Sequence, residues 1–279
     1  MTTKEAITLF KNHQRSSLKQ RTQQSYNYLL HRFESQFGDN PLESVGPEDI
    51  YQFLEALTDQ SSKSTRRLRY AQIKAFYNLI IDNCCLNMKN PCSAPILSKS
   101  FKMPKREGRK ILDKENVDEM IYNAQCLRDR LILELQARCG LRIGEALNLR
   151  VKDISDRKLI LQGPKSGKDQ EVAFMPEQVA KRLVEYIHNE NLSPEDRLFP
   201  ICYSTARSLI RRSGEKLNIK ISPHDLRRHS ATYASRNGVP LEIISKVILR
   251  HQDLKTTQMY LGKVSDTEAI RWMDTLHER

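Results

Sequence analysis

The chain has 279 residues, and its 46 lysines and arginines outnumber its 34 acidic residues to give a formal net charge of +12. No stretch is apolar over a membrane-spanning length, the N-terminus shows no signal-peptide pattern, and the six cysteines form no C-x-x-C pair. We therefore expect a soluble cytoplasmic protein with free thiols, without a zinc site or a disulfide framework. The length predicts two compact domains, and the charge favours a polyanion, first of all nucleic acid, as partner; a merely basic soluble protein is the alternative.

Residues 1–92 are predicted to form an all-helical first domain. Thr3 and Thr22 are candidate N-caps for its first two helices, because both precede apolar residues at helical spacing. A third helix is expected to open at Pro47, and a fourth near Ser61 to Ser64.

The fourth predicted helix mixes cations with aromatic residues. Arg66, Arg67 and Lys74 lie on it, and Tyr70 and Tyr77 stand among them. Such a pattern suits a solvated charged face and a helix laid against a DNA backbone equally well. The candidates for DNA binding on this helix are Arg66, Arg67, Tyr70 and Lys74.

Residues 93–110 are predicted to be a linker, because prolines and cations replace the helical periodicity. Lys102, Lys105 and Arg106 make this linker basic. A basic linker between two basic domains could pass along a nucleic acid and close a clamp around it, although a linker need only be soluble.

Residues 111–279 are predicted to form the second domain, which combines helices with a small antiparallel sheet. Two strands, 158–162 and 171–174, are joined by the polar turn GPKSGKD. Helices are expected over 176–189 and 204–217, and a last amphipathic helix over 266–277. The predicted fold class is mainly α, with the sheet confined to the second domain.

The segment 222–262 begins with a well-marked helix. Ser222 is a good N-cap and Pro223 a good first residue, while Asn237 and Gly238 end the helix. A second helix with an apolar face is expected after Pro240.

His224 and Arg227 share one face of the first of these helices, because they are three residues apart. His251 and Tyr260 follow in the same segment. A guanidinium binds two phosphate oxygens at once, histidines move protons near neutral pH, and tyrosine can act as a covalent nucleophile. The group favours phosphoryl transfer through a phosphotyrosine, provided that further cations lie upstream.

Arg142 and Lys165 are the upstream candidates. Gly140 lets the chain turn, and Glu145 lies three residues beyond Arg142, where its carboxylate could hold the guanidinium in place. Lys165 stands in the predicted turn between the strands, with Lys168 as a competitor. Taken singly, each of these residues has an ordinary interpretation as a surface charge, a helix cap or a packing aromatic.

The order and spacing R-(22)-K-(58)-H-x-x-R-(23)-H-(8)-Y resembles that of the tyrosine recombinase family, which includes phage integrases, Xer recombinases and Cre. Four segments match the family's boxes: GLRIGEAL, GPKSGKDQEVAF, HDLRRHSAT and LRHQDLKTTQMY. The family pattern has a valine seven residues after its lysine, which favours Lys165 over Lys168. The helical first domain is similar to the family's SAM-like core-binding domain, so the resemblance implies a two-domain DNA clamp.

The chain departs from the family pattern at four positions. Arg228 and His229 stand where the family often has a single histidine, Arg250 replaces a common glycine, and Gly144 replaces a common serine. None of these departures removes a catalytic residue.

The resemblance implies that Tyr260 attacks a phosphodiester of duplex DNA and forms a 3′-phosphotyrosyl link with a free 5′-hydroxyl. Arg142 and Arg227 would hold the non-bridging oxygens, and His251 would add a hydrogen bond to them. Lys165 would protonate the leaving oxygen and His224 would assist proton transfer at the tyrosine.

The resemblance also implies an enzyme without metal, ATP or other cofactor that exchanges DNA strands in a tetramer of identical protomers. A monomer or dimer would occupy each half-site or site, and the C-terminal helix would dock on a neighbour. An accessory protein that sets direction or activates one pair of protomers fits the same scheme, as does a cytoplasmic, nucleoid-associated location.

Two other functions remain open from the sequence. A non-catalytic helix-turn-helix DNA-binding protein would explain the charge and the spacing of Ala234 and Gly238, but not Arg142 or Tyr260. A type IB topoisomerase would share the catalytic residues and relax supercoils without exchanging strands.

Overall fold

The computed structural model describes residues 1–102, 111–163, 170–258, 261, 270 and 273, and the side chains of all of these except 15–17. The chain divides into two compact units, Met1–Arg106 and Glu107–Arg279, each with its own hydrophobic core. Among the residues that the structure describes, no helix has the length and apolar run needed to cross a bilayer.

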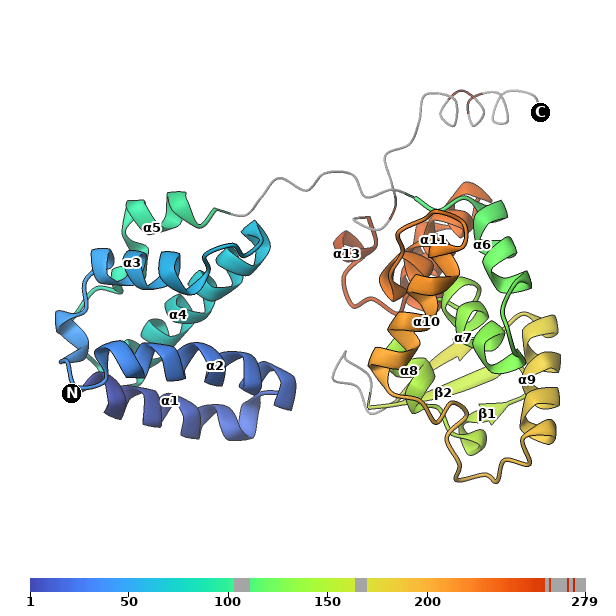
Figure 1. Cartoon of the computed structure of the whole chain (residues 1–279), viewed down its shortest axis with the longest axis horizontal. Helices are drawn as coiled ribbons and strands as arrows, with labels where there is room; N and C mark the ends of the chain where they lie inside the picture. The colour runs from blue at the N-terminus through green and yellow to red at the C-terminus, as the bar shows by residue number, and fades with distance from the viewer. Residues whose placement is uncertain (103–110, 164–169, 259–260, 262–269, 271–272, 274–279) are drawn as a thin grey trace. The chain divides into compact units, whose positions relative to one another are not determined.

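The first unit is entirely helical in its described part (Figure 1). The helices α1 and α2 lie side by side, and α4 packs against α1 and α3. The elements are α1 (Thr3–Ser17), α2 (Gln20–Phe37), η1 (Leu42–Ser44), α3 (Pro47–Leu57), α4 (Lys63–Asn83), η2 (Pro91–Ser93) and α5 (Pro95–Ser100).

The predicted caps of the first unit are right for two helices and wrong for two. Pro47 opens α3, and the hydroxyl of Ser62 caps α4. However, α1 is capped by Thr2, and Thr22 lies inside α2 rather than before it. The N–H of Thr22 already donates to the carbonyl of Lys19, so the helix begins earlier than the threonine suggested.

The predicted linker is wrong over 93–102. Pro95 starts α5, and Leu97 and Phe101 are buried in the core of the first unit. Leu97 and Phe101 are four residues apart, so one turn of helix places both on the same face. The prolines mark the start of a helix here and not a linker. Residues 103–110 lie outside the described residues.

The second unit wraps its helices around one buried helix, α7 (Leu127–Ala137) (Figure 1). α7 contacts five other helices of the unit. These are α6 (Lys114–Tyr122), α8 (Ile143–Asn148), α9 (Glu177–Asn189), α10 (Tyr203–Glu215) and α11 (Pro223–Arg236). The buried carboxylate of Glu134 on α7 accepts two hydrogen bonds from Arg182, at 2.6 and 3.0 Å. These bonds join α7 to α9. The contacts of α7 with α8 and α11 fix these two helices, which carry the candidate site.

The sheet of the second unit has three antiparallel strands in the order β1 (Ile154–Ser155), β2 (Lys158–Gln162) and β3 (Gln170–Phe174). It follows the 3-10 turn η3 (Val151–Asp153). Leu159 pairs with Ile154 on one side and with Ala173 on the other. Leu159 and Ala173 face the core. The prediction of a mainly helical chain with a small antiparallel sheet in the second domain is confirmed.

The helix α11 starts as predicted, with Ser222 before it and Pro223 as its first residue. The carboxylate of Asp225 accepts hydrogen bonds from the Ser222 N–H, at 2.9 Å, and from its hydroxyl, at 2.6 Å. The helix ends at Arg236, and Gly238 has φ of +81°. This local hydrogen bonding fixes where His224 and Arg227 lie on the helix.

The expected amphipathic helix after Pro240 is different in the structure. α12 (Leu241–Ile243) gives way to a π-helical turn, η4 (Ile244–Ile248), and then to α13 (Leu254–Gln258). The N–H of Leu249 reaches the carbonyl of Ile244, and the N–H of His251 reaches that of Ser245. These wide turns bury Ile244 and leave Ile243 45% exposed. The helix predicted over 266–277 lies outside the described residues except for Ile270 and Met273.

Candidate active site

The site is built on the turn between α7 and α8. Gly140 has φ of +64° there, and a Cβ at this position would lie 2.7 Å from the carbonyl oxygen of Ile248. Only glycine allows this close approach of the two segments. The carbonyl of Gly140 in turn accepts hydrogen bonds from the side chains of Arg227 and Arg250.

Arg142 is the residue that precedes α8, and it makes the contact with Glu145 that the spacing predicts. The backbone N–H of Arg142 donates to Glu145 Oε2 at 2.9 Å, and its Nη1 donates to Oε1. The Arg142 side chain is 30% exposed, whereas that of Glu145 is 10% exposed. Glu145 therefore holds a guanidinium that still faces solvent.

Glu145 is a buried carboxylate surrounded by arginines. Burial acts to raise its pKa, but Arg250 and Arg142 outweigh that effect and lower the pKa below its usual value. The group is thus ionised at neutral pH and anchors the surrounding guanidinium groups.

Arg227 projects from α11 into the same cluster and is 1% exposed. Its Nη1 donates to the carbonyl of Gly140 and its Nη2 to that of Leu249. Glu145 Oε2 lies 3.9 Å from Nη1, within ion-pair distance. The two carbonyl oxygens fix the orientation of this guanidinium beside Glu145.

His251 lies beside these cations and is neutral at pH 7. Burial and the charges of Arg227 and Arg142 are the main causes that lower its pKa to about 4, and His224 adds to this effect. The ring Nδ1 is 2.9 Å from the hydroxyl of Thr257. That hydroxyl donates to Ser245, so the imidazole donates from Nδ1.

The structure thus brings together four of the six predicted catalytic residues: Arg142, His224, Arg227 and His251. His224 is exposed in the first turn of α11. Lys165 and Tyr260 lie outside the described residues, so their placement stays a prediction.

Arg250 is the residue that the sequence analysis missed. It appeared there only as a departure from a common glycine, next to His251. In the structure its buried side chain donates to the carbonyls of Ile248 and Gly140 and to the carboxylate of Glu145. An unusual residue beside a predicted catalytic histidine was the signal that could have found it.

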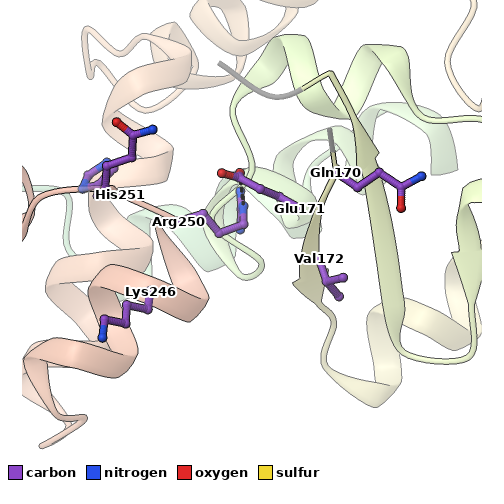
Figure 2. A pocket seen from close by; sticks show the side chains of 7 residues that line it. Gln170, Glu171, Val172, Lys246, Arg250 and His251 are labelled. Carbon is purple, nitrogen blue, oxygen red and sulfur yellow. Dashed lines mark ion pairs between the residues drawn. The ribbon is translucent and has the colours of Figure 1, made fainter. Parts of the chain in front are cut away.

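A cavity of about 530 Å³ adjoins this cluster. Figure 2 shows it between β3 and the segment that ends at His251, with the side chains of Arg250 and Glu171 turned toward one another. Its lining consists of Gln170, Glu171, Val172, Lys246, Arg250, His251 and Gln252.

The candidate DNA-binding residues of α4 separate into inward and outward side chains. Tyr70 is 2% exposed, its hydroxyl donates to the carbonyl of Cys92 at 2.7 Å, and its ring stacks on Phe101. The prediction that Tyr70 binds DNA is therefore wrong, because the side chain belongs to the core. The fully buried Tyr77 does not face DNA either.

The cations predicted to bind DNA keep that role only as a prediction. Arg66 pairs with Glu55, the Cζ of Arg67 lies 5.0 Å from the centre of the Tyr70 ring, and Lys74 is half-buried. Lys102 is exposed, while Lys105 and Arg106 lie outside the described residues.

The helix-turn-helix alternative does not fit the structure. The helix that would follow Gly238 has only three α-helical residues, Leu241–Ile243, before the π-helical turn. The preceding helix α11 is largely buried. Neither provides a free recognition helix for the major groove.

Comparisons with known proteins identify the family of the chain. The model of the phage integrase family matches residues 110–265, and the model of the phage integrase N-terminal SAM-like domain matches residues 8–84. A curated relative, tyrosine recombinase XerA of Pyrococcus horikoshii, is 30% identical over 250 residues, which cover 84% of this chain and 80% of the relative.

Solved structures show the same fold. The Tn1549 transposon integrase in complex with a circular intermediate DNA has a TM-score of 0.76 at 19% identity, with 99% of both chains covered. A lambda integrase tetramer bound to a Holliday junction has a TM-score of 0.73 at 15% identity, covering 94% of this chain and 77% of that one. The chain belongs to the phage integrase family of tyrosine recombinases.

Proposed function

We propose that the protein is a site-specific recombinase that cleaves and rejoins duplex DNA through a 3′-phosphotyrosyl intermediate. The observation that carries this proposal is the cluster in which Glu145 orients Arg142 beside Arg227 and His251. Two guanidinium groups and a histidine in one place can oppose the charge that builds on a phosphate under attack.

In the proposed step, the phenolic oxygen of Tyr260 forms a bond to the scissile phosphorus, and the bond from phosphorus to the 5′-oxygen breaks. Arg142 and Arg227 stabilise the non-bridging oxygens, and His251 adds a hydrogen bond. The number of phosphoester bonds stays constant, so a second 5′-hydroxyl can reverse the step without an external energy source.

Two protons must move in this reaction. His224 assists removal of the proton from Tyr260, and Lys165 delivers a proton to the leaving 5′-oxygen. These roles need neither a metal ion nor ATP. We therefore expect cleavage to proceed unchanged in the presence of a chelator.

Exchange of strands between two duplexes requires four cleaving protomers, and we propose a homotetramer on DNA. The lambda integrase neighbour is a tetramer on a Holliday junction, and the Tn1549 integrase neighbour is a DNA complex. The same assembly on this chain would join two duplexes, each carrying two protomers.

The test is an SDS-resistant adduct assay with the purified full chain and fragmented DNA from its own source. Wild type should form a covalent adduct in EDTA, the Tyr260→Phe variant should form none, and sequencing of the trapped ends would give the target site. Equal DNA binding by both proteins without any adduct would refute the proposed chemistry. An adduct that persists in Tyr260→Phe would show that another residue is the nucleophile.

A second assay distinguishes recombination from relaxation. Two DNA molecules that carry the trapped site are mixed with the enzyme, and products that join segments of both are counted. We expect joined products. Relaxation of supercoiled DNA without such products would instead identify a topoisomerase.

A further inference from the structure

Arg250 adopts a backbone conformation that is unfavourable for an arginine. Its φ is +50°, in the left-handed region where a side chain crowds its own backbone. A non-glycine residue in this region is destabilising and persists where the surrounding contacts enforce it. This residue precedes His251 directly, so the strain lies at the site itself.

The contacts of Arg250 join three segments of the site. Nη1 donates to the carbonyl of Ile248 at 2.8 Å, and Nη2 donates to Gly140 at 3.2 Å and to Glu145 Oε2 at 2.9 Å. On the opposite side, Nε lies 3.7 Å from Oε2 of Glu171 on β3. One side chain therefore connects the turn before Arg142, the helix α8 and the strand β3. Figure 2 shows its ion pair with Glu171.

The charges distinguish Arg250 from Arg227, although both are buried. The Arg250 guanidinium lies between two carboxylates, Glu145 and Glu171, and their negative charges neutralise its positive charge. Arg227 donates to carbonyl oxygens, and Glu145 Oε2 is 3.9 Å from its Nη1. Carboxylates therefore hold Arg250 more closely than Arg227, with Glu145 Oε2 at 2.9 Å and Glu171 Oε2 at 3.7 Å from its guanidinium.

Glu145 also needs Arg250 to stay in place. Its Oε2 accepts from the backbone N–H of Arg142 and from Arg250 Nη2, while Arg227 stands just beyond hydrogen-bonding distance. Without Arg250, this oxygen would attract Arg227 and draw its guanidinium away from its carbonyl partners. The hydrogen bond that orients Arg142 would shift with the carboxylate.

We propose that Arg250 is a positioning residue for phosphate activation, which holds Glu145 so that Arg142 and Arg227 meet the scissile phosphate together. The proposal rests on the function proposed above and adds a residue that acts through Glu145.

The experiment compares wild type with Arg250→Gly in single-turnover cleavage of a nicked suicide duplex carrying the target site, at saturating DNA. Glycine adopts the φ of this position without strain, so the variant tests the side chain and not the backbone. We expect cleavage to slow by about 10- to 100-fold, as is usual when a group that orients an active-site ligand is lost. Arg250→Lys should recover only part of the rate, because an ammonium lacks the planar fork.

A second substrate separates positioning from a general loss of structure. A methylphosphonate at the scissile position replaces one charged oxygen by a methyl group, so less charge is left for the arginines to oppose. If Arg250 acts through Arg142 and Arg227, the difference between Arg250→Gly and wild type should shrink to about threefold or less on this substrate. Circular dichroism and DNA affinity, measured on the same preparations, should match those of wild type.

The matched control is Lys246→Ala, which removes an exposed cation from the lining of the same cavity. Its cleavage rate should stay near that of wild type. Three outcomes would overturn the proposal: wild-type cleavage by Arg250→Gly, an equal loss on both substrates, or an equal loss from Lys246→Ala. Absence of cleavage by wild type on the phosphodiester would instead refute the proposed function.

Discussion

The two units of the protein are stabilised by different kinds of core. In the first unit Phe33 lies 5.0–6.4 Å, centre to centre, from the rings of Phe37, Phe53, Phe76 and Tyr77. In the second unit the core is mainly aliphatic, and α11 buries a run of polar residues beside it. That run comprises Arg227, Arg228, His229, Ser230 and Thr232.

The aromatic core of the first unit contributes to stability, whereas the buried polar residues of the second unit serve the proposed chemistry. Burial of aromatic rings stabilises a fold without any requirement for partners. A buried guanidinium or imidazole destabilises the fold unless each is paired, and here Arg228 pairs with Asp225 while His229 binds the carbonyl of Leu112. Substitutions in the first core should change stability alone, whereas substitution of Arg227 in the polar run should change cleavage first.

The largest effect is expected from Arg227→Lys. An ammonium cannot donate to Gly140 and Leu249 and also bind two phosphate oxygens, so cleavage of a suicide duplex should slow by roughly 10³-fold. The rate is measured at saturating DNA in a single turnover.

Arg228→Lys is the matched control, since this guanidinium is also buried, follows Arg227 directly and pairs with Asp225. Its cleavage rate should stay within about threefold of wild type. Similar losses in both variants would show that the polar run is needed for structure and not for phosphate binding.

Phe76→Ala should destabilise the first unit by about 3–5 kcal/mol, the usual effect of removing a buried phenylalanine. The ring is fully buried and lies 5.3 Å from those of Phe10 and Tyr77. Hydrogen exchange on the full chain would report amides of the first unit opening faster, while those of α7 and α11 keep their protection. Faster exchange throughout both units would show that the two cores unfold together.

A smaller effect is expected from the titration of His251. Its pKa is about 4 in the folded protein and near 6.5 when unfolded, so below pH 6.5 only the unfolded chain takes up the proton. The wild type should therefore lose stability between pH 6.5 and pH 4 relative to His251→Asn, with no difference above pH 7. Melting temperatures of both proteins across this range test it, and parallel curves would contradict the low pKa.

The features that the sequence predicted correctly are those that interactions between nearby residues determine. Ser222 and Pro223 start α11, the strands β2 and β3 pair across a polar turn, and Glu145 reaches back to Arg142. Each depends on residues close together in the chain, where cap, turn and i,i+3 rules apply.

The features that the sequence could not predict depend on contacts between residues far apart in the chain. The strained Arg250 depends on Glu145 and Glu171, about 100 and 80 residues before it in the chain. The helix α5 is held in place because the ring of Phe101, which follows it, stacks on the ring of Tyr70 in the first core. Composition alone made that segment look like a linker.

The smallest effect is expected from substitution of Tyr70, and it tests whether this side chain belongs to the core and not to a DNA-binding surface. Its hydroxyl donates to the carbonyl of Cys92 inside the first unit, so Tyr70→Phe should cost about 1 kcal/mol and leave DNA affinity unchanged. Arg67, whose Cζ lies 5.0 Å from the centre of the same ring, is the matched control. If Arg67 contacts a phosphate, Arg67→Ala should weaken binding to all sequences alike and reduce the salt dependence of binding by about one unit of slope. Weaker DNA binding by Tyr70→Phe at unchanged stability would instead place the tyrosine hydroxyl at the DNA surface.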